Sequence, residues 1–380
     1  MSPSVLLWVR LRQCVFAALI TLCLLGLFIV RCRPDITIPP FDIQMFSQTE
    51  GAKRLCPTDL NAQKTNQAAD DTIVLIWMWP FGVKFDLSCR ALGITGCRLT
   101  DDKALYKRAH GVLFHHRDID EDLGNMPMEP RPRFQKWVWS NSESPANTVP
   151  IPELNNMFNL TSNYRRDSDI PVPYGSLVPV TDGDPSFKLP AKDKLVCWVV
   201  SNWNPKFKRV QVYTELSNHI DIDIYGKAFD RPVDNQDLPK LISSCKFYLS
   251  FENSIHEDYI TEKLYNPLKV GTVPVVLGPS RQNYEDYIPG DSFIHLDDFA
   301  GAKQLAERLR YLDQNPTEYM RYFDWRGKFT AKTVWLGLYS ACRTCHYLQI
   351  HRGYQAFHNL NKWYWGDKGD GGLNGTLGPR

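Results

Sequence analysis

The sequence predicts an α/β protein that has a parallel sheet and divides into two domains. Residues 247–280 indicate an apolar strand over Phe247–Phe251, a helix over Tyr259–Val270 and a second strand over Thr272–Leu277. Two strands joined in this way run parallel, and helices cover the sheet that they form. The chain has 380 residues, 43% of them hydrophobic, whereas single cores stop growing near about 250–300 residues. We therefore expect two packed domains.

The helix of this central unit carries charges at its start. Asp258 stands where an N-cap is expected, and Gly271 stands where many helices end in a left-handed residue. Glu262 and Lys263 lie in the first turn, beside Tyr259. A helix N-terminus with a lysine and free backbone N–H groups suits a phosphate, and a carboxylate there can hold a hydroxyl group. The pattern also fits a core unit with a solvated charged face, and charge alone does not decide between these two interpretations.

Residues 11–30 predict a membrane-spanning helix near the start of the chain. Cys14–Val30 is almost wholly apolar, with Arg10 and Arg12 before it and Arg31 and Arg33 after it. A spanning helix needs about 17–25 residues, which 11–30 supplies. A cleaved signal peptide has a shorter apolar core of about 7–15 residues and small residues at its cleavage site, which Arg31–Pro34 does not offer. Because the tail over 1–10 is short, we expect a type II anchor in a Golgi membrane, followed by a lumenal stem over 31–71.

The first domain is expected over 72–185. Ile73–Trp79 and Gly111–Phe114 are dense in apolar residues and indicate buried strands. A further apolar run ends in a polar turn that carries Glu143. A glutamate in such a turn is usually only solvated. The stretch Thr181–Pro190 is rich in Gly, Pro and Asp, and it marks the boundary to the next domain.

The second domain is expected over 186–345. Its first strand is followed by a turn at Ser201 and Asn202, and Arg209 comes next in the chain. A last segment over 346–380 is expected to pack back and to end in a disordered, glycine-rich tail. The elements expected outside the central unit are strands at Leu195–Val200, Asp221–Tyr225 and Phe293–Leu296, and helices at Leu238–Ser244 and Ala300–Asp313.

Cysteines are frequent, with ten in the chain. Cys342 and Cys345 form a Cys-x-x-Cys pair, which by itself suits a redox, zinc or structural role. An oxidising lumen favours disulfides, and no second pair of this spacing completes a zinc site. The sequence alone does not fix which cysteines pair. Those in the expected lumenal part are Cys56, Cys89, Cys97, Cys197, Cys245, Cys342 and Cys345.

Three segments of the central unit carry a family resemblance. The motifs FENS (251–254), DYITEK (258–263) and GTVPVVLGP (271–279) resemble the donor-binding signature of the α-1,3-fucosyltransferases, glycosyltransferase family 10. The signature is long and ungapped, so it is more specific than a single short motif. The resemblance extends from about Ile73 to Trp365 and is strongest to the members that form Lewis X. It implies two Rossmann-like domains facing a cleft (GT-B type), with the donor on the C-terminal domain and the acceptor on the N-terminal one.

The resemblance also implies a reaction. L-Fucose moves with inversion from GDP-fucose to the 3-hydroxyl of N-acetylglucosamine in Galβ1-4GlcNAc units of glycoproteins and glycolipids. Glu143 is implied as the general base, and Arg209 and Lys263 as the cations that hold the departing diphosphate. The family does not strictly require a metal or another cofactor. The implied donor-binding residues are Tyr174, Ser201, Asn202, Arg209, Tyr248, Asn253, Tyr259, Glu262 and Lys263.

On the acceptor side, the resemblance assigns two residues. Arg117, in the His-His-Arg-Asp segment, is implied to favour the 3-hydroxyl over the 4-hydroxyl. Val83 departs from the family pattern, because close relatives carry a glutamine after the Pro-Phe-Gly turn. A lost hydrogen bond there weakens acceptor binding or changes acceptor choice. Asn159 and Asn374 begin N-glycosylation sequons, which suit a lumenal chain.

The resemblance implies three disulfides: Cys89–Cys342, Cys97–Cys345 and Cys197–Cys245. Cys56 is then left over in the stem, and the sequence leaves open whether two copies pair through it. A net charge of +2, from 44 basic and 42 acidic residues, gives no reason to expect nucleic acid. The Asp-x-Asp pairs at 167–169 and 221–223 lie away from the donor signature, and we interpret them as structural and not as metal ligands.

Two other functions stay open at the level of sequence. A transferase of another nucleotide sugar is one, because groups that hold phosphate do not identify the sugar. A non-catalytic membrane protein with a sugar-binding cleft is the other. The presence of Glu143, Arg209, Glu262 and Lys263 together argues against the second.

Overall fold

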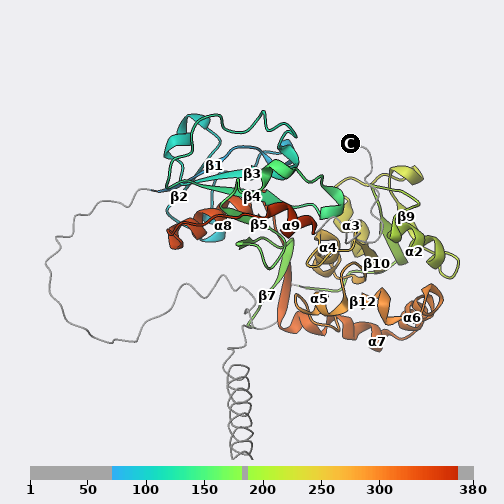
Figure 1. The fold of residues 1–380 in the computed structure, drawn as a ribbon. Helices are drawn as coiled ribbons and strands as arrows, with labels where there is room; N and C mark the ends of the chain where they lie inside the picture. The colour runs from blue at the N-terminus through green and yellow to red at the C-terminus, as the bar shows by residue number, and fades with distance from the viewer. Residues whose placement is uncertain (1–70, 182–186, 367–380) are drawn as a thin grey trace, which may run out of the picture. The chain divides into compact units, whose positions relative to one another are not determined.

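The computed structural model describes residues 71–181 and 187–366, and both ranges belong to one compact unit. The expected membrane anchor over 11–30, the stem up to residue 70 and the sequon at Asn374 lie outside these ranges. Within them, no helix combines the length and apolar character needed to cross a membrane. Two parallel sheets organise the described residues (Figure 1).

The first sheet has the strand order β2-β1-β3-β4-β5-β6, and every neighbouring pair is parallel. Its central strands are buried along their length, as expected for a parallel sheet with both faces covered. The register places Asn141, at the end of β4, opposite Asn163, at the end of β5. The strands are β1 (Thr72–Ile76), β2 (Cys97–Thr100), β3 (Gly111–His115), β4 (Lys136–Asn141), β5 (Leu160–Asn163) and β6 (Ile170–Pro171).

The second sheet has the order β12-β11-β10-β8-β9 and is also parallel throughout. Its strands are β8 (Lys194–Val199), β9 (Asp223–Tyr225), β10 (Cys245–Phe251), β11 (Val273–Leu277) and β12 (Ile294–His295). The helices in this part of the chain are α2 (Lys208–Leu216), α3 (Leu238–Ser243), α4 (Glu262–Val270), α5 (Arg281–Glu285), α6 (Ala302–Gln314) and α7 (Pro316–Met320). Helix α6 buries Leu305, Leu309 and Leu312, a spacing that puts them on one face.

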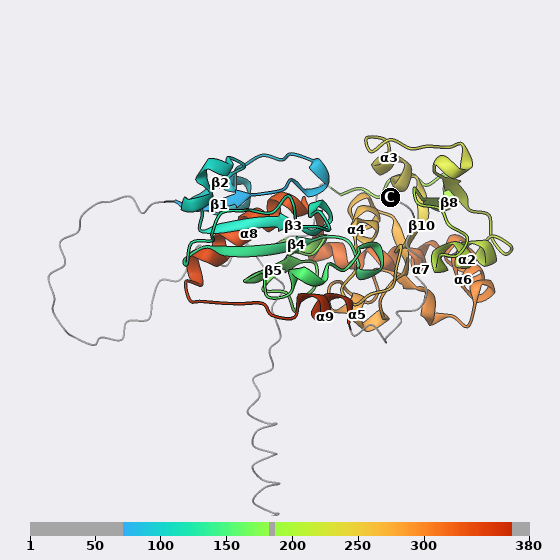
Figure 2. The same ribbon diagram turned by 45° about the horizontal axis from the view of Figure 1, so that its top comes forward.

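The chain returns to the first sheet after α7. Strand β13 (Phe329–Thr333) pairs antiparallel with β7 (Gly175–Pro179), and α8 (Leu336–Ile350) then packs on β1, β2, β3 and β6. Figures 1 and 2 show α8 beside the strands of the first sheet. Helix α9 (Leu360–Trp365) follows. We call the first sheet with α8 and α9 the N-terminal lobe, and the second sheet with α2–α7 the C-terminal lobe. The expected domain limit at residue 345 falls inside α8.

The central unit is a parallel strand–helix–strand unit, β10–α4–β11, as predicted. Gly271 ends the helix in the left-handed conformation with φ 80°, which confirms the predicted C-terminal residue. The predicted start is wrong. Helix α4 begins at Glu262, and its N-cap is Thr261, whose hydroxyl accepts from the Lys263 backbone N–H. Asp258 instead has φ 61° and lies in the preceding loop.

The helix starts later than predicted because Asp258 binds other residues. Its carboxylate accepts hydrogen bonds from the backbone N–H and Nε of Arg166, both at 3.0 Å, and from Asn283 Nδ2 at 2.9 Å. Arg166 comes from the N-terminal lobe, 92 residues away along the chain. A carboxylate that is engaged by these distant donors is not available to cap the helix.

Strand β1 is also shorter than the predicted Ile73–Trp79, since it ends at Ile76. A 3₁₀ turn over Pro80–Gly82 follows, in which Phe81 has a left-handed φ of 55°. The backbone N–H of Phe81 donates to Asp118 Oδ2 at 3.0 Å. This contact draws the chain toward the end of β3 and away from the line of the sheet.

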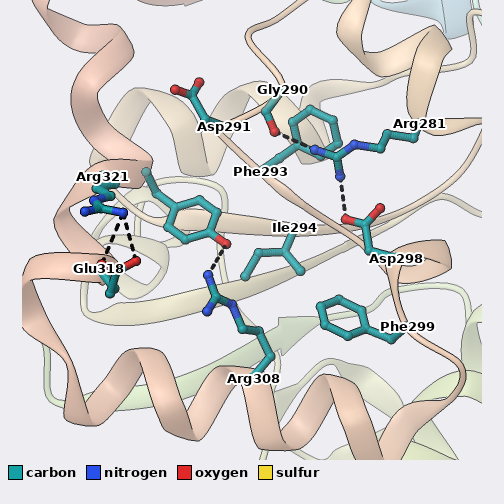
Figure 3. A pocket seen from close by; sticks show the side chains of 11 residues that line it. Arg281, Gly290, Asp291, Phe293, Ile294, Asp298, Phe299, Arg308, Glu318 and Arg321 are labelled. Carbon is teal, nitrogen blue, oxygen red and sulfur yellow. Dashed lines mark hydrogen bonds and ion pairs between the residues drawn. The ribbon is translucent and has the colours of Figure 1, made fainter.

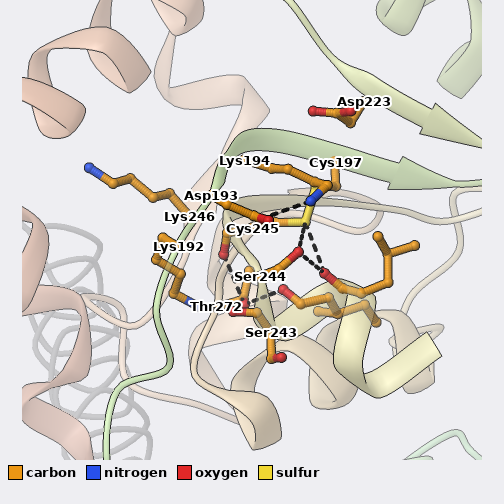
Figure 4. Close-up of a disulfide and its surroundings, with 12 residues drawn as sticks. Lys192, Asp193, Lys194, Cys197, Asp223, Ser243, Ser244, Cys245, Lys246 and Thr272 are labelled. Atoms are coloured by element: carbon orange, nitrogen blue, oxygen red, sulfur yellow. Dashed lines mark hydrogen bonds and ion pairs between the residues drawn. A yellow bond between two sulfur atoms is a disulfide. The ribbon is translucent and has the colours of Figure 1, made fainter. Parts of the chain in front are cut away.

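Three disulfides join the pairs that the family resemblance implies: Cys89–Cys342, Cys97–Cys345 and Cys197–Cys245. The first two tie α8 to Cys89 and to Cys97 at the start of β2, and Ala341 and Leu348 of the same helix are buried against the first sheet. The third, shown in Figure 4, links β8 to β10 beside Thr272. Cysteine bridges therefore hold the returning segment and the centre of the second sheet.

The two bridges of α8 close almost the same loop, of 253 and 248 residues. While one is present, the other closes only a short additional loop. We therefore expect replacement of Cys89 and Cys342 by serine to lower the free energy of unfolding by about 3 kcal/mol, and replacement of all four cysteines by more than twice that amount. Urea unfolding measures both values, and non-reducing peptide mapping checks the pairing. Equal losses for the single and double removals would contradict this expectation.

Candidate active site at the carboxyl ends of the two sheets

The second sheet has a topological switch point between β8 and β10. From β8 the chain moves to β9 on one side, and it then returns to β10 on the other side of β8. In open α/β sheets, ligands bind outside the carboxyl ends of the strands at such a point. The turn with Ser201 and Asn202 follows β8, and Glu252 and Asn253 follow β10. Four polar residues thus flank the switch point, three of which the sequence predicts as donor-binding.

Glu252 is the residue that sequence analysis missed. Its side chain is buried, and its carboxylate accepts from the Thr261 backbone N–H at 2.8 Å and from the Thr261 hydroxyl at 2.9 Å. It also pairs with Lys263 Nζ at 3.3 Å. Burial raises the pKa of Glu252, because desolvation disfavours the charged form. The available signal was a glutamate directly after a buried strand.

Lys263 is held by two carboxylates at the start of α4. Its Nζ lies 3.2 Å from Glu262 Oε1, in addition to the contact with Glu252, and donates to the Thr261 hydroxyl at 2.9 Å. Burial works against its charge, but Glu252 and Glu262 raise the pKa of Lys263 above its usual range. Burial works to raise the pKa of Glu262, but the charge of Lys263 and the hydrogen bonds to the carboxylate together lower it. The lysine therefore remains a cation that is still partly exposed to solvent.

Arg209 is the second residue of α2 and is buried, with 5% exposure. Its guanidinium donates to the Asn202 carbonyl, which fixes the arginine to the turn after β8. Burial lowers the pKa of Arg209, while Glu252 opposes that effect. Among the described residues, its Nε has no hydrogen-bond partner. A buried cationic donor without a partner suits an anionic ligand.

Glu143 follows β4 in the N-terminal lobe and is held from several directions. Its backbone N–H donates to Asn141 Oδ1 at 3.1 Å, and the Tyr364 hydroxyl donates to its carbonyl. Its carboxylate accepts from the Tyr259 hydroxyl at 3.4 Å and lies 3.9 Å from Arg117 Nη1. The side chain keeps 24% exposure. The structure thus brings three predicted residues together: Glu143, Arg117 and Tyr259.

Tyrosines line the junction of the two lobes. The Tyr174 hydroxyl donates to the Ser142 carbonyl, and its ring meets that of Tyr259 edge-on at 6.2 Å. Tyr164 contacts Tyr259 at 5.1 Å. Burial raises the pKa of Tyr174 and of Tyr259 well above the usual value, so both phenols are neutral hydrogen-bond donors at neutral pH.

Two loops from different lobes are joined by polar contacts. Ser144 Oγ lies 2.6 Å from Ser254 Oγ, and Asn147 Nδ2 donates to Asn253 Oδ1 at 2.9 Å. These contacts connect the loop that carries Glu143 to the loop that follows β10. Sequence analysis singled out only Asn253 of the four, because the others are recognised only once the two loops are seen together.

The remaining predicted residues lie in other environments. Tyr248 is buried within β10 beside the Cys197–Cys245 bridge, and burial raises its pKa to about 12. Val83 is exposed and lines a pocket together with Tyr174 and Glu262. The roles given to the predicted residues by the family resemblance stay predictions.

A second pocket, near β12, contains none of the predicted site residues (Figure 3). Its three arginines are already engaged. Arg281 donates to Asp298 and Gly290, Arg321 pairs with Glu318, and Arg308 donates to the Tyr322 hydroxyl. This pocket therefore does not compete with the switch point as the candidate active site.

Asn159 and the first Asp-x-Asp pair are engaged in the N-terminal lobe. Asn159 Nδ2 donates to the Gln355 carbonyl at 2.7 Å, so a glycan on this atom would replace that bond, and glycosylation there stays a prediction. Asp167 pairs with Arg165, and Asp169 accepts from the Thr161 hydroxyl at 2.9 Å. Across 71–181 and 187–366, no group of three or more His, Cys, Asp or Glu side chains is placed to hold a metal ion.

We expect Glu252→Ala to lower the free energy of unfolding by about 3–5 kcal/mol, because it leaves the Thr261 and Lys263 donors without their buried carboxylate. Glu257→Ala is the matched control, since Glu257 is exposed in the same loop, and it should change stability by no more than about 0.5 kcal/mol. Denaturant unfolding measures both. Equal stability of the two variants would show that the buried cluster does not hold α4 in place.

Comparison with known proteins gives the family. Residues 189–363 match the model described as glycosyltransferase family 10 (fucosyltransferase) C-term, and residues 69–175 match the model described as fucosyltransferase, N-terminal. The 4-galactosyl-N-acetylglucosaminide 3-alpha-L-fucosyltransferase 9 of Rattus norvegicus is 50% identical over 349 residues, 91% of this chain and 96% of that protein. The 3-galactosyl-N-acetylglucosaminide 4-alpha-L-fucosyltransferase of Pan troglodytes is 40% identical over 315 residues, 81% and 84% of the two chains.

A solved structure is similar as well. The crystal structure of an alpha1,3-fucosyltransferase with GDP-fucose aligns with a TM-score of 0.49 and 16% identity, over 76% of this chain and 93% of that one. The two family models and the 50% identity over most of the chain do not depend on this likeness. The chain belongs to glycosyltransferase family 10, the fucosyltransferases.

Proposed function

We propose that the chain transfers L-fucose from GDP-fucose to the 3-hydroxyl of N-acetylglucosamine in Galβ1-4GlcNAc units. The observation that carries this proposal is the arrangement at the switch point, where Arg209 and Lys263 lie at the carboxyl ends of β8 and β10 and the Glu143 loop contacts the loop after β10. The relative that is 50% identical is named for this transfer. In our proposal, the two lobes are the two Rossmann-like halves of a GT-B enzyme.

Two cations bind the diphosphate of GDP-fucose in the proposed mechanism, and they differ in environment. Lys263 is a cation stabilised by two carboxylates, and Arg209 is a buried guanidinium whose Nε lacks a partner in the part of the chain that is described. Charges and donors of this kind stabilise a leaving diphosphate, whose negative charge grows as the bond to fucose breaks. The proposal includes no metal, because these cations supply the positive charge.

Glu143 is the general base of the proposed mechanism. Its carboxylate takes the proton of the acceptor hydroxyl while that oxygen attacks the anomeric carbon of fucose and the diphosphate leaves. A single displacement of this kind inverts the configuration. The Tyr259 hydroxyl, a neutral donor, and the Arg117 guanidinium orient the carboxylate from its two sides.

Regiochemistry and location complete the proposal. Arg117 lies within 3.9 Å of the proposed base, where it can contact the acceptor next to the reacting hydroxyl and favour the 3-position. Val83, in place of a glutamine, removes one hydrogen bond to the acceptor. The proposed location is a Golgi membrane in type II orientation, with glycans of glycoproteins and glycolipids as acceptors.

A donor panel tests the proposal against its alternatives. GDP-fucose, GDP-mannose and UDP-galactose are each offered with N-acetyllactosamine, and the product linkage is determined. We expect transfer from GDP-fucose alone, with an α-1,3 linkage. Transfer from another donor would support a different nucleotide-sugar enzyme, and no transfer from any donor would support a sugar-binding protein without activity. Substantial transfer to the 4-hydroxyl of type 1 chains would contradict the role of Arg117.

We expect Lys263→Ala and Arg209→Ala each to weaken GDP binding by about 10- to 100-fold, because each removes charge-assisted hydrogen bonds. Lys269→Ala is the matched control, since Lys269 is exposed at the other end of α4, and its GDP affinity should not change. Isothermal calorimetry measures all three. GDP affinity that survives both substitutions would remove this site as the phosphate site.

We expect Glu143→Gln to lower kcat by at least about 100-fold while GDP affinity stays close to wild type, because glutamine keeps the size of the side chain and cannot take a proton. Glu153→Gln, at an exposed glutamate of the same lobe, is the control and should retain full activity. Steady-state rates at saturating substrates measure the effect. A Glu143→Gln variant with more than about a tenth of wild-type kcat would transfer the role of base to another group.

A further inference from the structure

Arg166 extends from the N-terminal lobe and pairs with two carboxylates of the C-terminal lobe. It follows β5, directly before the Asp-x-Asp pair that sequence analysis interpreted as structural. Its Nε lies 3.0 Å from Asp258 Oδ1, and its Nη1 lies 2.8 Å from Asp286 Oδ2 at the end of α5. The guanidinium also lies over the ring of Tyr287, 5.4 Å from its centroid. One side chain of the first lobe therefore contacts three residues of the second.

The two carboxylates depend on Arg166 to different degrees. Asp258 is 6% exposed, and its carboxylate also accepts from Asn283 Nδ2 at 2.9 Å and from the Arg166 backbone N–H at 3.0 Å. Asp286 is 31% exposed and is in contact with solvent. Removal of the guanidinium alone thus leaves no buried carboxylate without a donor. We expect the Arg166 side chain to contribute more to the position of the loop around Asp258 than to folding.

The loop around Asp258 has a backbone conformation that needs support from its surroundings. Asp258 has φ 61°, a left-handed value that is uncommon for a residue other than glycine. Its backbone N–H donates to Asn283 Oδ1 at 2.7 Å, and its carbonyl accepts from the Ile260 N–H at 2.8 Å. The chain therefore turns sharply at Tyr259. Conformations of this kind persist where surrounding contacts hold them, and here Asn283 and Arg166 supply those contacts.

The sharp turn directs Tyr259 toward the opposite lobe. Its side chain is 2% exposed and belongs to the core cluster of the N-terminal lobe, where its ring lies 5.1 Å from that of Tyr164 and 6.2 Å from that of Tyr174. Its hydroxyl donates to Glu143 Oε2 at 3.4 Å. This distance is near the upper limit for a hydrogen bond, so a shift of about half an ångström in the loop breaks the contact.

Contacts on both sides of Tyr259 hold the loop in place. After it, Thr261 is bound by the buried carboxylate that follows β10, within the C-terminal lobe. Before it, Asp258 is bound by Asn283 of its own lobe and by Arg166 of the other lobe. Without the Arg166 side chain, the contacts of Thr261 still fix the start of α4. The position of Tyr259 relative to the N-terminal lobe then loses its nearest ion pair.

We propose that Arg166 is a positioning residue for the general base of the transfer. Its pairs with Asp258 and Asp286 fix the loop between the lobes. The fixed loop holds the Tyr259 hydroxyl at the Glu143 carboxylate. Arg166 acts through these residues and not on the substrates, and displacement of a group by about 1 Å can cost about 100-fold in rate. This inference rests on the proposed function, in which Glu143 takes the proton of the acceptor.

Arg166→Ala tests this role by separating kcat from donor binding. We expect kcat to fall about tenfold, because the base stays in the site but loses its orientation, and the KM for GDP-fucose to stay within about twofold. Arg281→Ala is the matched control. Arg281 is 36% exposed, against 39% for Arg166, and it also pairs with two carboxylates, both of its own lobe. Its removal should not change kcat. Equal losses in the two variants, or a change in KM alone, would overturn the role.

Arg166→Lys tests whether the ion pairs carry the effect. A lysine ammonium can pair with one of the two carboxylates, but it lacks the planar fork that reaches both. We expect this variant to restore kcat to within about threefold of wild type, since one of the pairs is kept. A lysine variant with no higher kcat than Arg166→Ala would contradict the proposal.

Tyr259→Phe removes the hydroxyl through which Arg166 is proposed to act. We expect Arg166→Ala to change kcat by less than about twofold when it is added to Tyr259→Phe, because two changes that act through one contact are not additive. Independent effects would multiply. A further loss of about tenfold in the double variant would therefore overturn the proposed route through Tyr259.

Hydrogen–deuterium exchange of the full chain tests the position of the loop independently of turnover. We expect Arg166→Ala to speed exchange at the backbone amides of residues 258–260 about tenfold, and Arg281→Ala to leave it unchanged. If the wild type transfers no fucose but Arg166→Ala speeds exchange in this way, the proposed function fails and the positioning of the loop stands. If the wild type transfers fucose and Arg166→Ala changes neither kcat nor exchange, the positioning role fails and the proposed function stands.

Discussion

The contacts of the buried Glu252 carboxylate with Thr261 and Lys263 hold the C-terminal lobe in its observed geometry. The carboxylate binds the backbone and hydroxyl of Thr261 and the ammonium of Lys263, and so ties the end of β10 to the start of α4. An isolated carboxylate is not stable in such a place, because desolvation is offset only when the remaining lone pairs are satisfied. The pairing also keeps Lys263 charged at the switch point. One side chain therefore sets the start of α4 and the cation beside it.

The same cluster determines how the two lobes meet. Since α4 begins only at Glu262, the preceding loop is free to extend toward the N-terminal lobe, where Tyr259 packs in the core cluster of that lobe and Asp258 pairs with Arg166. The Tyr259 hydroxyl reaches Glu143 from this position. A helix that started at Tyr259, as the sequence suggested, would have kept this tyrosine in its first turn. The proposed base would then lack a donor from the opposite lobe.

Sequence reasoning succeeded where the determinants are local and failed where they are distant. The strands of the central unit and the left-handed Gly271 follow from apolar runs and from backbone preference, and both are present. The predicted N-cap of α4 is wrong because the Asp258 carboxylate binds Arg166 instead, a residue that is close to it only in the folded chain. Ser144 and Ser254 gave no signal, since their contact joins two loops that lie 110 residues apart along the chain.

The two parts of the site differ in the kind of discrimination that they can provide. The switch point holds charged groups, which bind phosphate strongly but do not distinguish one nucleotide sugar from another. The pocket beside Glu143 holds the neutral amides of Asn141 and Asn163 and the imidazole of His115 in fixed orientations, because their other atoms are already bonded to the backbone or to Asp118. A site built to pair with hydroxyls rejects a ligand that lacks them far more strongly than it rejects a change in apolar bulk, since its buried polar groups are then left unpaired. In the proposed function, affinity for the donor resides in the C-terminal lobe, and the choice of acceptor depends on side chains that the first sheet holds in place.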